Sequence, residues 1–309
     1  MKWQPYAKLT QGRTDDVLAV EQKVLELLKG CPVPRILGID HEMSSIFFEH
    51  KGSNTLDDVC RHSDILQRRQ LGTNLISGFC QIEKRFAQHQ TKLLAHVSAA
   101  ASHQRLANVA VNCRTEAQRG LSAIVRDSTL RHELREKLDK ICDRIDKLPA
   151  SLGSTDYNAR NIVVDDSATN LTFIEFATIG WDWPERRLVQ YAIGLGSKQN
   201  GGFVSVLDQI NSKQYVNAGT NDPAFRAFAL DGHHLLFHLN AAAKLLKALK
   251  QPEIKQHKLL LASWRQPNLR LSQLHKALTT PLTEDPSTSD FRKLFGTTVL
   301  PKFDTGDKL

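Results

Sequence analysis

The sequence predicts an α+β protein with two parts: a small N-terminal part of strands and one helix, then a large, mainly helical part. Three observations support this prediction. Short β-rich runs lie before residue 50, apolar residues recur at three- to four-residue spacing from about 62 to 149 and again after 185, and one β-hairpin lies between the helices. We therefore expect domains at 1–50 and 51–280, the hairpin at 153–176, and a partly disordered tail at 281–309.

The composition is that of a globular protein. At 309 residues, with 41% hydrophobic and 24% charged residues, the chain is long enough for two domains. Its apolar runs are shorter than the roughly 20 residues of a membrane span, and its start lacks the apolar region of a signal peptide. The five cysteines are scattered and form no Cys-x-x-Cys pair, which favours a reducing compartment. We expect a cytoplasmic protein without a membrane partner.

The formal charge of +8 favours anionic partners in general. Basic and acidic residues are mixed along most of the chain, as in Arg135-Glu136-Lys137, so this charge is typical of an ordinary solvated surface. A helical nucleic-acid-binding protein is an alternative that rests on net charge alone, and we do not favour a nucleic-acid partner.

The N-terminal elements follow in order. A short strand, Tyr6 to Leu9, carries Lys8, and apolar residues at helical spacing predict a helix from about 17 to 28. Glu21 lies beside the apolar stripe of this helix, which a glycine and a Pro-Val-Pro segment end. Residues 35–40 and 45–50 then read as two strands around a polar turn.

The stretch with the clearest chemical pattern lies in the helical part. Asp156 is followed after four residues by Asn161, then by the β-rich run Ile162-Val163-Val164, a polar turn, and a second β-rich run that ends in Glu175. Such runs around turn-forming residues predict a β-hairpin. The hairpin brings Asn161 and Glu175 to the same end of two antiparallel strands.

An Asp, an Asn and a second acid in one place fit a phosphoryl-transfer site. There, an Asp positions the attacking hydroxyl, while an Asn and an acid hold Mg²⁺ against the nucleotide phosphates. A lone Asp-x-x-x-x-Asn has little specificity. The prediction depends on the hairpin, on the acid at its far end, and on the strand Lys and helix Glu upstream.

In their order, these elements resemble the aminoglycoside phosphotransferase and choline kinase group of the protein-kinase-like fold. The resemblance covers residues 6–60 and 150–195. It implies a two-lobe fold with a small, truncated β-rich N-lobe and a large helical C-lobe. It also implies an ATP- and Mg²⁺-dependent kinase in which Asp156 accepts the proton of a substrate hydroxyl, and Asn161 and Glu175 bind the metal.

The resemblance assigns the nucleotide contacts to the N-terminal part. Lys8, braced by Glu21, would hold the α- and β-phosphates. The backbone near Phe48, Glu49 and His50 would meet the adenine edge, in the segment that joins the two lobes.

The sequence departs from the family pattern near the phosphates. Ser154 stands where the family has His, Thr155 where it has Gly, and Glu175 where it has the metal-binding Asp. Arg187 stands about where an Asp often braces the catalytic loop. The hairpin that covers the phosphates in the family is missing before Lys8, so either the true N-terminus lies upstream or the protein works with an open nucleotide site. The catalytic motifs are therefore degenerate.

Two further groups of residues have an alternative interpretation. His234 and His238, spaced i, i+4 on a predicted helix, could share a metal, but no acid or cysteine at ligand spacing accompanies them, and we favour packing. Trp181 and Trp183 could stack on a substrate ring or anchor the packing of the C-lobe.

The leading functional hypothesis is a transferase: a small-molecule kinase whose acceptor is a hydroxyl of a sugar, amino alcohol or related metabolite. The alternative is a pseudokinase, a scaffold that binds a nucleotide or a protein partner without phosphoryl transfer. Ser154, Glu175 and the missing hairpin favour this alternative.

Overall fold

The computed structural model describes residues 14–40, 42, 45–97, 99–196, 202–219 and 222–300. Lys8 and its expected strand lie outside the described residues. The chain divides into two compact units, one made of residues 1–106 and 149–194 and the other of 107–148 and 195–309. Helix α5 (Ala99–Ile124) begins in the first and ends in the second.

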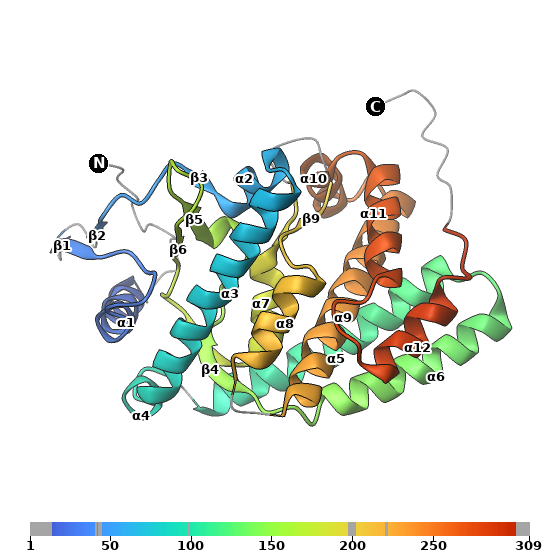
Figure 1. The fold of residues 1–309 in the computed structure, drawn as a ribbon, viewed down its shortest axis with the longest axis horizontal. Coiled ribbons are helices and arrows are strands. Elements are labelled where there is room, and N and C mark those ends of the chain that lie inside the picture. The colour runs from blue at the N-terminus through green and yellow to red at the C-terminus, as the bar shows by residue number, and fades with distance from the viewer. Residues whose placement is uncertain are drawn as a thin grey trace. The chain divides into compact units, whose positions relative to one another are not determined.

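The described residues of the first unit combine helices with three small antiparallel sheets (Figure 1). Its helical elements are α1 (Thr14–Leu27), α2 (Leu56–His62), α3 (Ile65–Gln88), α4 (Gln90–Leu94), the 3₁₀ turn η1 (Ala159–Asn161) and α7 (Pro184–Ala192). Its strands are β1 (Ile36–Asp40), β2 (Ser45–Phe48), β3 (Asn54–Thr55), β4 (Ser151–Ser154), β5 (Ile162–Val164), β6 (Leu171–Phe173), β7 (Ile179–Asp182) and β8 (Ile193–Gly194).

Both predicted hairpins are present in this unit. Strands β1 and β2 pair antiparallel, and so do β5 and β6, where Ile162 lies opposite Phe173. Strand β3 extends the second hairpin by pairing with β5, and β4 pairs with β7. The expected helix near 17–28 is α1; the chain then turns through Gly30, whose φ of 91° is a left-handed conformation that glycine adopts without strain.

Helix α3 forms the centre of this unit. Its buried face includes Leu71, Leu75, Phe79 and Phe86, all at helical spacing. The helix packs against β4, β6 and α7. The predicted β5–β6 hairpin therefore packs, through β6, against a long helix whose apolar stripe is already visible in the sequence.

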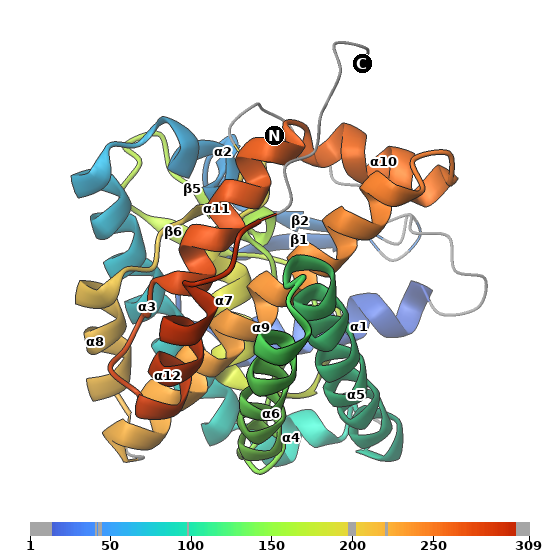
Figure 2. The same ribbon diagram turned by 90° about the vertical axis from the view of Figure 1, so that its right-hand side faces the viewer.

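The second unit is almost entirely helical. Its elements are the end of α5, α6 (Ser128–Ile145), β9 (Val204–Ser205), α8 (Gln209–Asn217), α9 (Pro223–Lys250), α10 (Lys255–Trp264), α11 (Pro267–Thr279) and α12 (Pro286–Phe295). Helix α9 is its core, and α6, α11 and α12 pack against it (Figure 2). Among the described residues, no helix is both long and apolar enough to cross a membrane.

Part of the expected C-terminal tail is folded. Asp285 caps helix α12, and Phe291 and Phe295 on this helix are buried. Arg292 donates hydrogen bonds of 2.9 and 3.2 Å to the two carboxylate oxygens of Asp231, which is fully buried on α9. Aromatic burial and this ion pair fix a segment in which the sequence shows mainly turn-forming residues.

The histidine pair on α9 has a packing role in the structure. His234 and His238 are both buried, and the Nδ1 atom of His238 lies 2.8 Å from the carbonyl oxygen of His234. Burial lowers the pKa of His234 well below its ordinary value and that of His238 to about 4. In the described part of the chain, no cluster of three or more His, Cys, Asp or Glu residues suited to a metal is present.

Replacing Arg292 with Met is expected to lower the free energy of unfolding by about 3–5 kcal/mol, because the buried Asp231 carboxylate then loses its cation. Urea denaturation measures the loss. Arg119→Met is the matched control: its ion pair with Glu116 is exposed, so it should cost no more than about 1 kcal/mol. Equal losses in the two variants would contradict the structural role of Arg292.

The histidine burial predicts a pH dependence. Unfolding restores an ordinary pKa near 6.5 to His238, so the unfolded state binds more protons than the folded state between that pH and about 4. The free energy of unfolding should therefore fall as the pH is lowered through this window. Urea denaturation at several pH values tests this, and His238→Gln should flatten the dependence. An unchanged slope would exclude His238 as its source.

Candidate functional site

The loop that carries Asp156 follows strand β4. The register of β4 with β7 places Gly153 opposite Gly180, and the amide of Thr155 extends the pairing by donating to the carbonyl of Thr178 at 3.0 Å. Asp156 comes next and is partly exposed. The side-chain amide of Asn161 donates to the carbonyl oxygen of Asp156 at 2.9 Å. The proposed base and the proposed metal-binding amide are thus joined directly.

The end of the hairpin brings Asn161 and Glu175 together as predicted. The amide of Ile174 donates to the carbonyl of Asn161 at 2.9 Å, so Glu175 lies one residue beyond the position opposite Asn161. Glu175 has a φ of 70°, a left-handed conformation that is rare for a residue with a side chain. The sequence contains no signal for this conformation.

The peptide unit after Glu175 is hydrogen-bonded at both of its polar ends. The Oγ atom of Ser154 donates to the carbonyl oxygen of Glu175 at 3.2 Å, and the amide of Phe176 donates to Oε1 of Glu21 at 3.2 Å. Ser154 Oγ also accepts a hydrogen bond from the amide of Asp156 at 3.2 Å. Ser154 therefore contacts both the loop that carries the proposed catalytic base Asp156 (the base loop) and the segment that carries Glu175.

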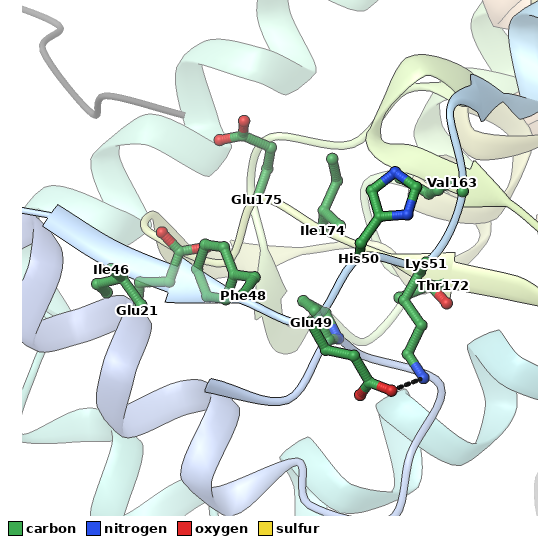
Figure 3. Close-up of a pocket in the computed structure, with 12 residues that line it drawn as sticks. Glu21, Ile46, Phe48, Glu49, His50, Lys51, Val163, Thr172, Ile174 and Glu175 are labelled. Carbon is green, nitrogen blue, oxygen red and sulfur yellow. Dashed lines mark ion pairs between the residues drawn. The ribbon is translucent and has the colours of Figure 1, made fainter. Parts of the chain in front are cut away.

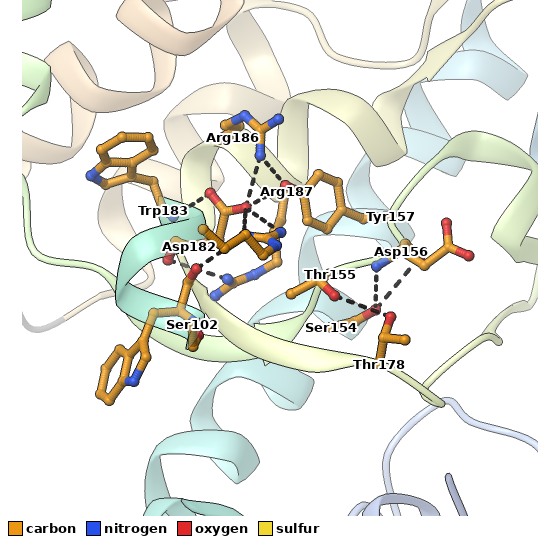
Figure 4. Close-up of polar contacts among 12 residues, drawn as sticks. Ser102, Ser154, Thr155, Asp156, Tyr157, Thr178, Asp182, Trp183, Arg186 and Arg187 are labelled. Carbon is orange, nitrogen blue, oxygen red and sulfur yellow. Dashed lines mark hydrogen bonds and ion pairs between the residues drawn. The ribbon is translucent and has the colours of Figure 1, made fainter. Parts of the chain in front are cut away.

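A buried cluster around Asp182 holds the other side of the base loop (Figure 4). The Oδ2 atom of Asp182 accepts from the Tyr157 hydroxyl, from Arg186 at 2.7 Å and from Arg105 at 3.1 Å. Burial by itself would raise the pKa of Asp182, but Arg186 and the hydrogen bond from Tyr157 bring it below its ordinary value. In Figure 4 the carboxylate of Asp156 points away from this cluster.

Arg187 has a partner that the sequence does not reveal. Its guanidinium is buried and donates to both carboxylate oxygens of Glu83, at 2.6 and 3.0 Å. It also donates to the carbonyl oxygens of Ser151 and Asp182. A Cβ atom on Gly153 would lie only 2.7 Å from the Arg187 guanidinium carbon, so glycine is needed where the strand crosses the arginine.

A pocket in the first unit collects most of the predicted nucleotide-binding residues. Its volume, including its open mouth, is about 740 Å³. Apolar walls come from Ile46, Phe48 and Ile174, and the polar groups include Glu21 and Glu175. Figure 3 shows the carboxylates of Glu21 and Glu175 on one side of the pocket and an ion pair between Glu49 and Lys51 on the other.

The segment that joins β2 to β3 forms one edge of this pocket. Lys51 Nζ lies 3.0 Å from Glu49 Oε1, and its hydrogen bond lowers the pKa of Glu49. The backbone amide of Glu49 donates to the carbonyl of Arg35 at 2.9 Å. That amide is therefore used in the sheet. The exposed His50 also lines the pocket.

The structure thus places Glu21, Phe48, Glu49, His50 and Glu175 around one pocket. Asn161 joins this group through the hairpin, and Asp156 joins it through Asn161 and Ser154; Lys8 lies outside the described residues. Sequence reasoning missed the contributions of Lys51, Tyr157, Asp182 and Glu83. The sequence offers a weak signal for Lys51, which directly follows the predicted strand. For the others, the partner is distant in sequence.

The left-handed conformation of Glu175 predicts an unusual order of stability. A side chain at such a φ costs roughly 1–2 kcal/mol, which glycine avoids. Glu175→Gly should therefore be about 1 kcal/mol more stable to urea than Glu175→Ala, although both variants lack the carboxylate. An alanine variant at least as stable as the glycine variant would argue against this conformation.

Comparison with known proteins gives similarity in structure only. No protein-family model and no curated protein matches the sequence. The GDP complex of wild-type aminoglycoside 2'-phosphotransferase-IIIa matches with a TM-score of 0.50 at 12% identity, covering 86% of this chain and 83% of that protein.

Two further structures also match, each at 12% identity. A choline/ethanolamine kinase family protein from Mesorhizobium loti has a TM-score of 0.45, over 92% of this chain and 83% of that one. The ethanolamine kinase of Plasmodium vivax has a TM-score of 0.43, over 84% and 71%. At the level of the fold, the first match confirms the prediction: the chain has the protein-kinase-like α+β fold in the form found in aminoglycoside phosphotransferases.

Proposed function

We propose that this protein is an ATP-dependent phosphotransferase that phosphorylates a hydroxyl group of a small molecule. One observation carries the proposal. The hairpin end and Ser154 connect Asp156, on a partly exposed loop, to a pocket that contains the carboxylates of Glu21 and Glu175. A base, oxygen ligands for a metal and a slot for a nucleotide are the parts that phosphoryl transfer requires.

The nucleotide would occupy the pocket of the first unit. The adenine ring of the nucleotide would lie between the apolar side chains of Phe48 and Ile174, beside the Glu49–His50 segment. Lys8, braced by Glu21, would hold the α- and β-phosphates. The similar aminoglycoside 2'-phosphotransferase-IIIa was solved with GDP, so nucleotide binding is known for a protein of this fold.

The donor atoms near the hairpin end fit Mg²⁺, which takes oxygen ligands. Glu175 offers a carboxylate at the pocket wall. The NH₂ group of Asn161 is bonded to the Asp156 carbonyl, so its amide oxygen is the atom suited to the metal. These two residues would hold the ion, which when bound supplies charge neutralisation for the phosphates.

The chemical step would depend on Asp156. Its carboxylate accepts the proton of the acceptor hydroxyl as the hydroxyl oxygen attacks the γ-phosphorus, the bond to the β-phosphate oxygen breaks, and ADP leaves. The side-chain amide of Asn158 lies 3.4 Å from one Asp156 carboxylate oxygen, and Asn161 holds the Asp156 carbonyl, so the loop is preorganised. Positioning, rather than covalent chemistry by the protein, supplies most of the catalysis.

The second candidate is a pseudokinase that binds a nucleotide or a partner without transfer. Glu175 favours this alternative: its extra methylene, relative to Asp, displaces a metal-binding carboxylate by more than about 1 Å, and Mg²⁺ demands near-ideal octahedral geometry. Displacements of this size can cost about 100-fold in rate. The two candidates differ in turnover, because only the phosphotransferase releases ADP.

The test begins with a thermal-shift titration using ATP and Mg²⁺ at millimolar concentration. The wild type should be stabilised and Asn161→Ala much less, because that variant loses a metal ligand. ADP release is then measured over a panel of sugar and amino-alcohol acceptors. Asp156→Ala should reduce ADP release at least about 100-fold because the base is lost.

Each outcome discriminates. The absence of any nucleotide-induced shift in the wild type would rule out the phosphotransferase and leave only a pseudokinase that acts through a partner. Nucleotide binding without ADP release would favour the pseudokinase, and equal ADP release from Asp156→Ala would remove Asp156 from the mechanism. Thr155→Val is a suitable control beside the base, because it removes only a hydroxyl contact with Thr178.

A further inference from the structure

We propose that Ser154 is a positioning residue that fixes the metal ligand Glu175 relative to the catalytic base Asp156. Together, Ser154 and Glu21 hold the peptide unit after Glu175 by hydrogen bonds at both of its ends, an arrangement we call the clamp. This inference rests on the proposed phosphotransferase function. It assigns to Ser154, which replaces a His of the resembling family, a role that the sequence alone leaves open.

The clamp acts on a single peptide unit. The carbonyl oxygen of Glu175 accepts from Ser154, and the amide of Phe176, in the same peptide plane, donates to Glu21. Both clamping side chains are almost completely buried, at 3% exposure for Ser154 and 2% for Glu21. A peptide plane bonded at both ends by buried groups from two distant elements has little freedom to rotate.

Rotation of this plane would directly affect Glu175. The left-handed φ of 70° is unfavourable for glutamate and persists only where surrounding contacts enforce it. Glu175 lines the pocket. With the carbonyl and the next amide fixed, the direction in which its Cα–Cβ bond leaves the backbone is fixed as well. Without the clamp, the backbone could relax to a negative φ and turn the carboxylate away.

The second hydrogen bond of Ser154 extends the clamp to the base. Its Oγ accepts from the amide of Asp156 while it donates to the Glu175 carbonyl, both at 3.2 Å. One hydroxyl therefore links the residue that would take the substrate proton to the residue that would hold the metal. Both contacts involve backbone atoms of Asp156 and Glu175, and neither uses a side-chain carboxylate.

The inference differs from a simple packing role in what it predicts. Loss of the Ser154 hydroxyl should misplace the Glu175 carboxylate, so a higher Mg²⁺ concentration is needed for half-maximal rate. It should also loosen Asp156, so the chemical step slows. The acceptor pocket is not altered, so the KM for the acceptor should remain nearly constant.

The experiment compares wild type with Ser154→Ala and Ser154→Thr. Alanine is smaller than serine and adds no clash, while threonine retains the hydroxyl. For Ser154→Ala we expect kcat to fall about 10-fold or more, and the Mg²⁺ concentration for half-maximal rate to rise by a similar factor. The KM for the acceptor should change less than about twofold, and threonine should recover much of the loss.

A second measurement does not require activity. Hydrogen exchange followed by NMR should show faster exchange of the Asp156 amide in Ser154→Ala, because its acceptor is removed. Thr155→Val, at the next residue, is the matched control and should leave both the Mg²⁺ dependence and the Asp156 amide unchanged. Faster exchange in Ser154→Ala alone supports the clamp.

The results separate this inference from the proposed function. An active wild type with unchanged kcat, Mg²⁺ dependence and Asp156 exchange in Ser154→Ala overturns the clamp and leaves the function intact. A wild type without Mg²⁺–nucleotide binding or ADP release overturns the function and the catalytic role of Ser154, and hydrogen exchange then decides the clamp by itself. An equal loss in Thr155→Val overturns the specific role of Ser154.

Discussion

The ion pair between the buried Arg187 and the partly buried Glu83 is the interaction on which the geometry of the site depends. It joins α7 to α3 through two parallel hydrogen bonds, the strongest arrangement available to a guanidinium and a carboxylate. The same guanidinium bonds the carbonyls of Ser151 and Asp182, at the paired ends of β4 and β7. A buried arginine is tolerated only with such partners, so the strands, the two helices and the charge pair form together or not at all.

The Arg187–Glu83 pair fixes strand β4, and strand β4 in turn positions the base loop that follows it. Strand β4 crosses Arg187 at Gly153, and the next residues are anchored on opposite sides: Ser154 to the Glu175 carbonyl, and Tyr157 to Asp182. Asp156 lies between these two anchors. A residue held by its neighbours in this way needs few contacts of its own, which leaves its carboxylate for another molecule.

Local patterns in the sequence were sufficient for the fold and for part of the site. The β5–β6 hairpin follows from β-branched runs around turn formers, and its pairing fixes the positions of Asn161 and Glu175. The Arg187–Glu83 pair spans 104 residues, and nothing local in the sequence marks such a partner. The φ of Glu175 is likewise imposed by tertiary contacts. Helix α12 was missed because buried aromatic residues and Arg292 outweigh its turn-forming composition.

The departures from the family pattern have a different meaning once the contacts are known. Taken one at a time, Ser154 for His and Glu175 for Asp look like losses from a catalytic motif. In the structure they are hydrogen-bonded to each other. The strain in the backbone of Glu175 is a cost that stability alone does not explain, since glycine would remove it. A strained acid that lines a pocket, with both ends of its following peptide unit hydrogen-bonded, is easier to explain by a ligand that it must meet. The backbone strain at Glu175 therefore supports the proposal of a metal–nucleotide site.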